Sequence, residues 1–329
     1  MELVLANHSS YPRIGESGEF QSLRRTIAAW EKGEKTDLDL SAAEDRMTDL
    51  ALCDQAEAGL DVVTDGQIRW YDPVSHLAGK LQGIRINGLL RFFDTNFYFR
   101  QPVVESEIRR TRPLVVEEFV FAKKQSARPV KPVLTGPYTL ARLSIENEDK
   151  PGGFEKALEG YAAALAEEVA ALAAAGATLI QVDEPALLKN PADFHYVEQG
   201  LATLAARKGA AQLALALYFG DPAPLYGRLQ TLPVDVLNLD FTYSPRLVET
   251  IAASGASKTL ALGLVDGRNT RLEDPASVSR QLERIVSSLG AGRVYLSPSC
   301  GLEYLPRDRA LSKLGHLATI RKTFWGSRA

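Results

Sequence analysis

Eight short apolar runs alternate with long helical patterns along this chain of 329 residues. The apolar residues within each run follow one another almost without interruption, as in strands that are buried on both faces of a parallel sheet. Strands that alternate with helices in this way predict a (β/α)8 TIM barrel. The predicted strands are residues 2–7, 61–65, 132–136, 178–184, 212–218, 235–240, 259–266 and 293–299.

Capping signals mark several of the helices between these runs. Ser41, with Glu44 three residues later, has the capping-box pattern and predicts a helix that starts at residue 41, with Cys53 packed in or near the core. Residues 154–177 are strong helix formers, and Gly176 supplies the stop signal. A further helix is predicted to start at Asp274-Pro275 and to end at Gly290.

One segment, residues 83–105, breaks the alternation of strands and helices. It carries an Asn87-Gly88 pair, a strong turn signal, within a β-rich aromatic stretch. We interpret it as a β-hairpin inserted between the second and third strands. Since no repeat or low-complexity linker interrupts the chain, residues 1–329 are expected to form one barrel domain that carries this hairpin.

Composition excludes several classes of protein. A net charge of −3 without a basic tract argues against binding to nucleic acid. No apolar run approaches the ~18 residues of a membrane span, and the N-terminus lacks the positive region of a signal peptide. Two cysteines are too few for a disulfide framework. A cytoplasmic enzyme that acts on a small molecule is therefore expected.

Polar side chains gather where the predicted strands end. In barrels of this type the chemistry lies at the carboxyl ends of the strands, which converge on one mouth. Any one aspartate there commonly caps the next helix or closes a turn. Several carboxylates in one small volume, however, need a cation, an ammonium group or a shifted protonation state. The candidate site residues are His8, Ser9, Ser10, Asp65, Gln67, Asp183, Glu184, Asp240 and Cys300.

Five stretches resemble the catalytic domain of cobalamin-independent methionine synthase, in its short single-domain form. They are "SSYPR" (9–13), "VVTDGQ" (62–67), "LTGPYTL" (134–140), "QVDEPAL" (181–187) and "SPSCGLE" (297–303), and they follow the family's order over nearly the whole chain.

The resemblance implies S-methyl transfer to homocysteine or a related thiol, with a zinc ion that holds the thiol as thiolate. It also implies that the Ser9-Ser10 loop binds the amino acid's carboxylate and that Asp183 binds its ammonium group. Asp65, Gln67 and Glu184 are then expected beside the substrate.

The sequence departs from the family's pattern at the zinc site. Where the family has a histidine and a cysteine after strand five, this chain has Ala216 and Tyr218, and Asp240 replaces a glutamate. Of the expected ligands only Cys300 is unchanged. It is thus a ligand of an altered, weak metal site with Asp240 and His8 or Asp221, a nucleophile, or a relic that packs at the mouth.

Three functions stay open on the sequence. The first is methyl transfer to homocysteine or a related thiol, with a methylcorrinoid, delivered by a corrinoid protein, or a methyl-folate as donor. The second is a diverged enzyme without zinc-thiolate chemistry, in which strand-end carboxylates and His8 act on another small substrate. Gln67 favours it, because the family has a glutamate there that helps hold the ammonium group. The third is a non-catalytic barrel that binds a partner. For His8 itself, the roles of general base, metal ligand and structural hydrogen bonder are all open.

Overall fold

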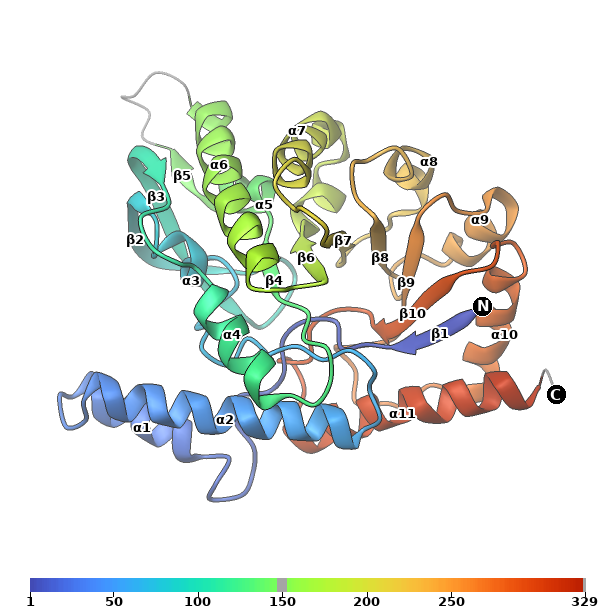
Figure 1. The fold of residues 1–329 in the computed structure, drawn as a ribbon, viewed down its shortest axis with the longest axis horizontal. Coiled ribbons are helices and arrows are strands. Elements are labelled where there is room, and N and C mark those ends of the chain that lie inside the picture. The colour runs from blue at the N-terminus through green and yellow to red at the C-terminus, as the bar shows by residue number, and fades with distance from the viewer. Residues whose placement is uncertain (147–152, 328–329) are drawn as a thin grey trace.

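The parallel strands of the barrel form the centre of the molecule. The computed structural model describes residues 1–146 and 153–327. Seven parallel strands follow the order β1-β10-β9-β8-β7-β6-β4 (Figure 1). Their bounds are β1 Glu2–Leu5, β4 Val133–Thr135, β6 Leu179–Asp183, β7 Gln212–Leu217, β8 Val236–Asp240, β9 Thr259–Val265 and β10 Arg293–Pro298. Each of these strands lies within a predicted apolar run or overlaps it.

The eighth predicted strand, residues 61–65, closes the ring through single bridges. Val62 forms a parallel bridge with Ala6, which follows β1, and Val63 forms one with Val130, which precedes β4. The backbone N–H of Lys131 donates to the Val63 carbonyl at 2.8 Å. This segment therefore lies between the two edge strands of the sheet, and the prediction of a TIM barrel is confirmed.

Helices surround the strands and bury their apolar faces against them. The helices are α1 Ser22–Glu31, α2 Asp37–Glu57, α3 Ser75–Ala78, α4 Val116–Gln125, α5 Pro137–Leu143, α6 Gly153–Ala174, α7 Phe194–Ala205, α8 Tyr226–Leu229, α9 Leu247–Ser254, α10 Pro275–Val286 and α11 Arg307–Gly326, with 3-10 turns η1 Pro185–Lys189, η2 Pro191–Asp193 and η3 Ala223–Leu225. Within the described parts of the chain, none of them has both the length and the hydropathy that crossing a bilayer would need.

The predicted helix starts are correct in one case and wrong in another. The Asp274 carboxylate caps α10, since it accepts from the N–H groups of Ala276 and Ser277 at 3.3 and 3.1 Å. The helix α2, however, begins before Ser41, because Thr36 and Asp39 form the capping box. Cys53 is exposed rather than near the core, since it lies away from the buried face of α2.

The predicted hairpin is present, but its turn lies elsewhere. Strand β2 (Gln82–Arg91) pairs antiparallel with β3 (Tyr98–Arg109), and β3 also pairs with the short β5 (Ile145–Glu146). The Asn87-Gly88 pair lies inside β2, at a register shift between Ile86 and Leu89. The turn is formed by residues 92–97, which we call the hairpin tip.

Aromatic contacts explain where the hairpin turns. The rings of Phe92 and Phe93 lie 6.3 and 6.0 Å from that of Phe219, just after β7. Phe97 lies 5.9 Å from Tyr304, in the loop after β10. The hairpin tip therefore packs over the carboxyl ends of the strands, and a turn at Asn87-Gly88 would forgo these contacts.

Candidate active site

The loop after β1 is held by neighbours on both sides. The Asn7 side-chain amide donates to the Ser9 carbonyl and to the Thr64 hydroxyl at 3.0 and 2.9 Å. On the other side, the Leu302 N–H donates to the Ser10 carbonyl at 3.1 Å, which ties this loop to the one after β10. The predicted residues Ser9 and Ser10 are both buried at the carboxyl end of the barrel.

His8 is a buried imidazole with one free nitrogen. Its Nδ1 lies 2.9 Å from the Ser9 hydroxyl, whereas Nε2 has no hydrogen-bond partner among the described residues. The ring packs edge-to-face on Tyr218, with 5.2 Å between the ring centroids. Burial, and secondly the charge of Lys131, hold the pKa of His8 well below its ordinary 6.5. At neutral pH the side chain is therefore an uncharged base.

Asp183, at the end of β6, accepts hydrogen bonds on both carboxylate oxygens. The Gln181 amide donates to Oδ1 at 2.8 Å, and the Tyr218 hydroxyl donates to Oδ2 at 3.2 Å. Burial raises the pKa of Asp183 above its ordinary value, and these two hydrogen bonds and the nearby Lys131 work against that rise. Tyr218 therefore connects the His8 ring with the predicted ammonium-binding carboxylate.

A buried lysine that the sequence analysis missed lies beneath these groups. Lys131 Nζ donates to the His8 carbonyl at 2.9 Å and to the Gln181 side-chain oxygen. Burial lowers the pKa of Lys131, and the charge of Asp183 raises it. The available signal in the sequence was Lys131 itself, a single lysine directly before the predicted buried strand 132–136.

The predicted substrate ligand Glu184 is committed to a helix instead. Its Oε1 accepts from the Tyr138 N–H at 3.0 Å, and Oε2 accepts from the N–H and the hydroxyl of Thr139 at 2.7 and 2.6 Å. It thus satisfies the free N–H groups in the first turn of α5. These contacts disfavour the predicted contact with substrate.

Asp65 and Gln67, at the end of the predicted second strand, lie in a tight turn near the mouth of the barrel. The Asp65 carboxylate accepts from the Gln67 N–H at 3.0 Å, and burial raises the pKa of Asp65 to about 6. Gln67 adopts a left-handed backbone conformation with φ of 52° and is largely buried. Asp65 thus holds the turn, and Gln67 contributes no charge.

The residues at the family's zinc positions do not fit a zinc ion. Ala216 has no donor atom, and the Tyr218 hydroxyl is engaged with Asp183. Both carboxylate oxygens of Asp240 accept backbone N–H groups, from Phe219 at 3.2 Å and from Thr242 at 2.7 Å. In residues 1–146 and 153–327, no three His, Cys, Asp or Glu side chains form a group suited to a metal ion.

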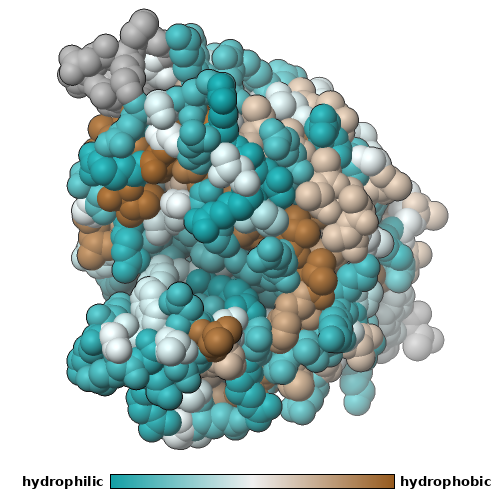
Figure 2. Space-filling model, turned by 60° about the vertical axis from the view of Figure 1, so that its left-hand side comes forward, coloured by the Kyte–Doolittle hydropathy of each residue, from teal (hydrophilic) through white to brown (hydrophobic). Residues whose placement is uncertain are grey.

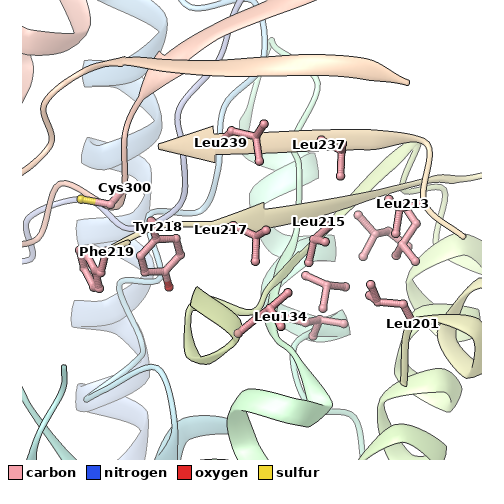
Figure 3. Packing of buried hydrophobic residues seen from close by; sticks show 14 of the residues in the cluster. Leu134, Leu201, Leu213, Leu215, Leu217, Tyr218, Phe219, Leu237, Leu239 and Cys300 are labelled. Carbon is pink, nitrogen blue, oxygen red and sulfur yellow. The ribbon is translucent and has the colours of Figure 1, made fainter. Parts of the chain in front are cut away.

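Cys300 lies at the predicted end of the barrel, but as a protonated thiol. Its Sγ donates to the Gly301 carbonyl at 3.4 Å, and burial, followed by the charge of Asp240, raises its pKa well above the ordinary value. Figure 3 shows Cys300 near Tyr218 at the carboxyl ends of β7 and β8, with the sulfur and the tyrosine hydroxyl pointing in different directions. Such a thiol is not a ready nucleophile.

Glu303, in the loop after β10, is a second residue that the sequence analysis missed. Its Oε2 is buried without a hydrogen-bond partner in the described structure. Burial raises its pKa to about 7, although a hydrogen bond with Tyr304 lowers it, and Asp183 adds to the rise. The residue closes the "SPSCGLE" stretch, so an acidic side chain three residues after Cys300 was the available signal.

Comparison with known proteins places the chain in a family. The family described as "Cobalamin-independent synthase, Catalytic domain" matches residues 10–323. The methionine synthase of Sulfurisphaera tokodaii is 32% identical over 311 residues, which cover 93% of this chain and 87% of that protein. The one from Saccharolobus solfataricus is 32% identical over 308 residues, which cover 93% and 90%.

Solved structures agree with this assignment at the level of the fold. A B12-independent methionine synthase from Shewanella sp. W3-18-1, in complex with selenomethionine, superposes with a TM-score of 0.78 at 22% identity and covers 99% of this chain and 100% of that one. A putative vitamin-B12 independent methionine synthase from Listeria monocytogenes gives 0.75 at 18% identity, with 97% and 96% covered. The chain therefore belongs to the cobalamin-independent methionine synthase catalytic-domain family of methyltransferases.

Proposed function

We propose that this protein transfers a methyl group to the thiol of homocysteine or of a related amino acid. The observation that carries the proposal is the family match over residues 10–323, which includes Ser10, Asp183 and Cys300. The relatives at 32% identity are named methionine synthases and are matched over nearly their whole length. Figure 2 shows the side toward which β1 runs in Figure 1, and this face is hollowed between largely hydrophilic walls.

In this proposal the amino acid is held between the loop after β1 and the end of β6. Backbone groups of Ser9 and Ser10 bind its carboxylate, and Asp183 binds its ammonium group. Asp183 suits this role because Gln181 and Tyr218 already fix its orientation. An ammonium ion beside it also favours the ionised carboxylate that burial disfavours.

The thiol must lose its proton without a zinc ion, and His8 is the base that we propose for this step. His8 Nε2 takes the thiol proton, and the resulting thiolate attacks the methyl carbon of the donor. The new S–C bond forms as the bond between the methyl group and the donor breaks. The electron pair of that broken bond stays on the donor atom, which then takes up a proton.

The energetics of this proton transfer depend on the charges that it creates. The lowered pKa of His8 makes it a weak base towards a thiol of pKa about 8.5, when each group is considered alone. Transfer, however, produces an imidazolium next to a thiolate in a buried place, and their attraction favours the transfer, as in the Cys–His pairs of thiol enzymes.

We propose a methyl-folate rather than a methylcorrinoid as the donor. The family's description as cobalamin-independent supports this choice. In a methyl-folate, the bond that breaks joins the methyl carbon to a ring nitrogen, and that nitrogen is the atom that ends protonated.

The test is an assay of methionine formation from L-homocysteine with either methyltetrahydrofolate or methylcobalamin, in the presence and absence of a chelator. We expect methionine only with the folate and at the same rate after chelation. Turnover of a different small substrate that requires His8, with no thiol methylated, would favour the diverged enzyme that Gln67 suggests. If the protein turns over none of the substrates tested, the remaining candidate function is a non-catalytic barrel that binds a partner.

A further inference from the structure

Buried polar atoms without partners lie on two neighbouring loops at the mouth. They are Asn7 Oδ1, His8 Nε2 and Ser10 Oγ, on the loop after β1, and Glu303 Oε2, on the loop after β10. The N–H of Leu302 joins these loops by its hydrogen bond to the Ser10 carbonyl. A buried polar atom without a partner costs about 1–3 kcal/mol, so several at one place indicate that a ligand supplies the missing partners.

Two of these atoms face the same point. A Cβ placed on Gly301 would lie 2.0 Å from Ser10 Oγ and 2.2 Å from Glu303 Oε2, with Ser9 Oγ at 3.0 Å. The absence of a side chain at Gly301 therefore lets these oxygen atoms approach one another beside its backbone. A group with several N–H donors would satisfy a carboxylate oxygen and a hydroxyl oxygen at once.

The negative charges near these oxygen atoms require a compensating cation. Glu303 and Asp183 are both buried carboxyl groups whose pKa burial raises, and the charge of Asp183 adds to the rise in the pKa of Glu303. The nearby cations have other partners, since Lys131 donates to the His8 carbonyl and Arg268 donates to the Asp94 carbonyl of the hairpin tip. The compensating charge is therefore best supplied by the ligand itself.

We propose that Glu303 is a carboxylate that binds the substrate's ammonium group, together with Asp183, and replaces the negative charge that Gln67 does not supply. The proposal rests on the proposed function, because it takes an amino-acid thiol as the substrate. Ser10 accepts a further hydrogen bond from the same ammonium group. The pocket thus keeps its selectivity for amino acids through a residue on the loop after β10.

The test compares two thiols that differ only in the ammonium group. L-homocysteine carries it, and 4-mercaptobutanoate has the same carboxylate and thiol without it. We expect Glu303→Gln to reduce the preference for L-homocysteine, measured as the ratio of the two KM values, by about 10- to 100-fold, the value of a charge-assisted hydrogen bond. An unchanged ratio in a variant with wild-type Tm would overturn the proposal.

A second substitution provides a matched control at position 67, in the turn after the predicted second strand. Gln67→Glu, added to Glu303→Gln, returns one negative charge to the pocket and should restore at least part of the preference for L-homocysteine. If the double variant keeps the low preference while both variants keep their Tm, charge compensation between the two positions is wrong. A wild-type protein that methylates neither thiol would instead overturn the proposed function, and this inference with it.

Discussion

The two sides of the barrel mouth differ in how their polar atoms are satisfied. On the β7–β8 side, the Tyr218 hydroxyl donates to Asp183, and both oxygens of Asp240 accept backbone N–H groups. Asn238 Oδ1, two residues deeper in β8, is the atom of this side that has no partner in the described structure. On the β1–β10 side, atoms of His8, Ser10 and Glu303 are buried without partners in the described structure.

The contrast shows which side is prepared for a ligand. Hydrogen bonds within the protein engage Tyr218 and Asp240 on the β7–β8 side, so a metal bound at these two positions would have to break them. On the β1–β10 side, buried polar atoms without hydrogen-bond partners reduce the stability of the fold, and such a cost is typical of functional sites. We infer that the chemistry of this chain depends on the β1–β10 side.

The largest effect should follow from removing His8. His8→Ala should lower kcat/KM for thiol methylation by about 10²- to 10⁴-fold, the contribution of a positioned general base. Because burial keeps the pKa of His8 below 6.5, its neutral form persists at lower pH, so the acid limb of the wild-type kcat profile at saturating substrate should lie below pH 6.5. The acid limb of kcat/KM also reports Glu303 in the free enzyme, whose pKa burial raises to about 7. A pH–rate profile of both proteins measures this, and an unchanged rate in the variant would contradict the proposed base.

Lys131 beneath the mouth should affect stability most. Lys131→Met leaves the buried Gln181 oxygen and His8 carbonyl with fewer donors, so the free energy of unfolding should fall by about 1–3 kcal/mol. Denaturant unfolding of the purified variant measures this. Lys123→Met, at an exposed lysine of α4, is the control and should change little. If the two variants are equally stable, the contacts of Lys131 do not contribute to the free energy of unfolding.

Tyr218→Phe should have a smaller effect, on the β7–β8 side. It removes the hydrogen bond to Asp183 Oδ2 but keeps the ring that packs on His8, so we expect a loss of about 1–2 kcal/mol in substrate binding. The KM for L-homocysteine measures it, with kcat as the internal control. A fall in kcat as large as that of His8→Ala would move the chemistry to the β7–β8 side and reverse the comparison.

Local patterns predicted the barrel well because each buried strand can be recognised from its own apolar run in the sequence. The turn of the hairpin could not be predicted in this way. Asn87-Gly88 is the stronger local signal, but contacts of Phe93 and Phe97 with residues more than a hundred positions away decide where the chain turns. Tertiary packing here overrides local turn propensity.

The candidate site was predictable in its location but not in its contacts. His8, Asp183 and Cys300 do lie at the carboxyl ends of the strands, because the topology of a barrel brings those ends together. Glu184 is adjacent to Asp183 in sequence, yet its side chain turns to α5. Glu303 was missed because its proposed role depends on Ser10, which only the folded chain brings close to it, next to Gly301.

The smallest effect is expected for Cys300, the one zinc-ligand position that retains the family's residue. Cys300→Ser keeps the size and the hydrogen bond to the Gly301 carbonyl, so stability should change by only about 1 kcal/mol. Because Ala216, Tyr218 and Asp240 do not complete a ligand set, the zinc content of the purified protein, measured by elemental analysis, should be low and equal in both forms. The matched gain is Ala216→His with Tyr218→Cys, which should bind zinc that a chelator removes, and should lose it again when Cys300→Ser is added. One tightly held zinc per wild-type chain, emptied by Cys300→Ser alone, would show that Cys300, on the loop after β10, and groups of the β7–β8 side hold a metal together, and that zinc, rather than His8, activates the thiol.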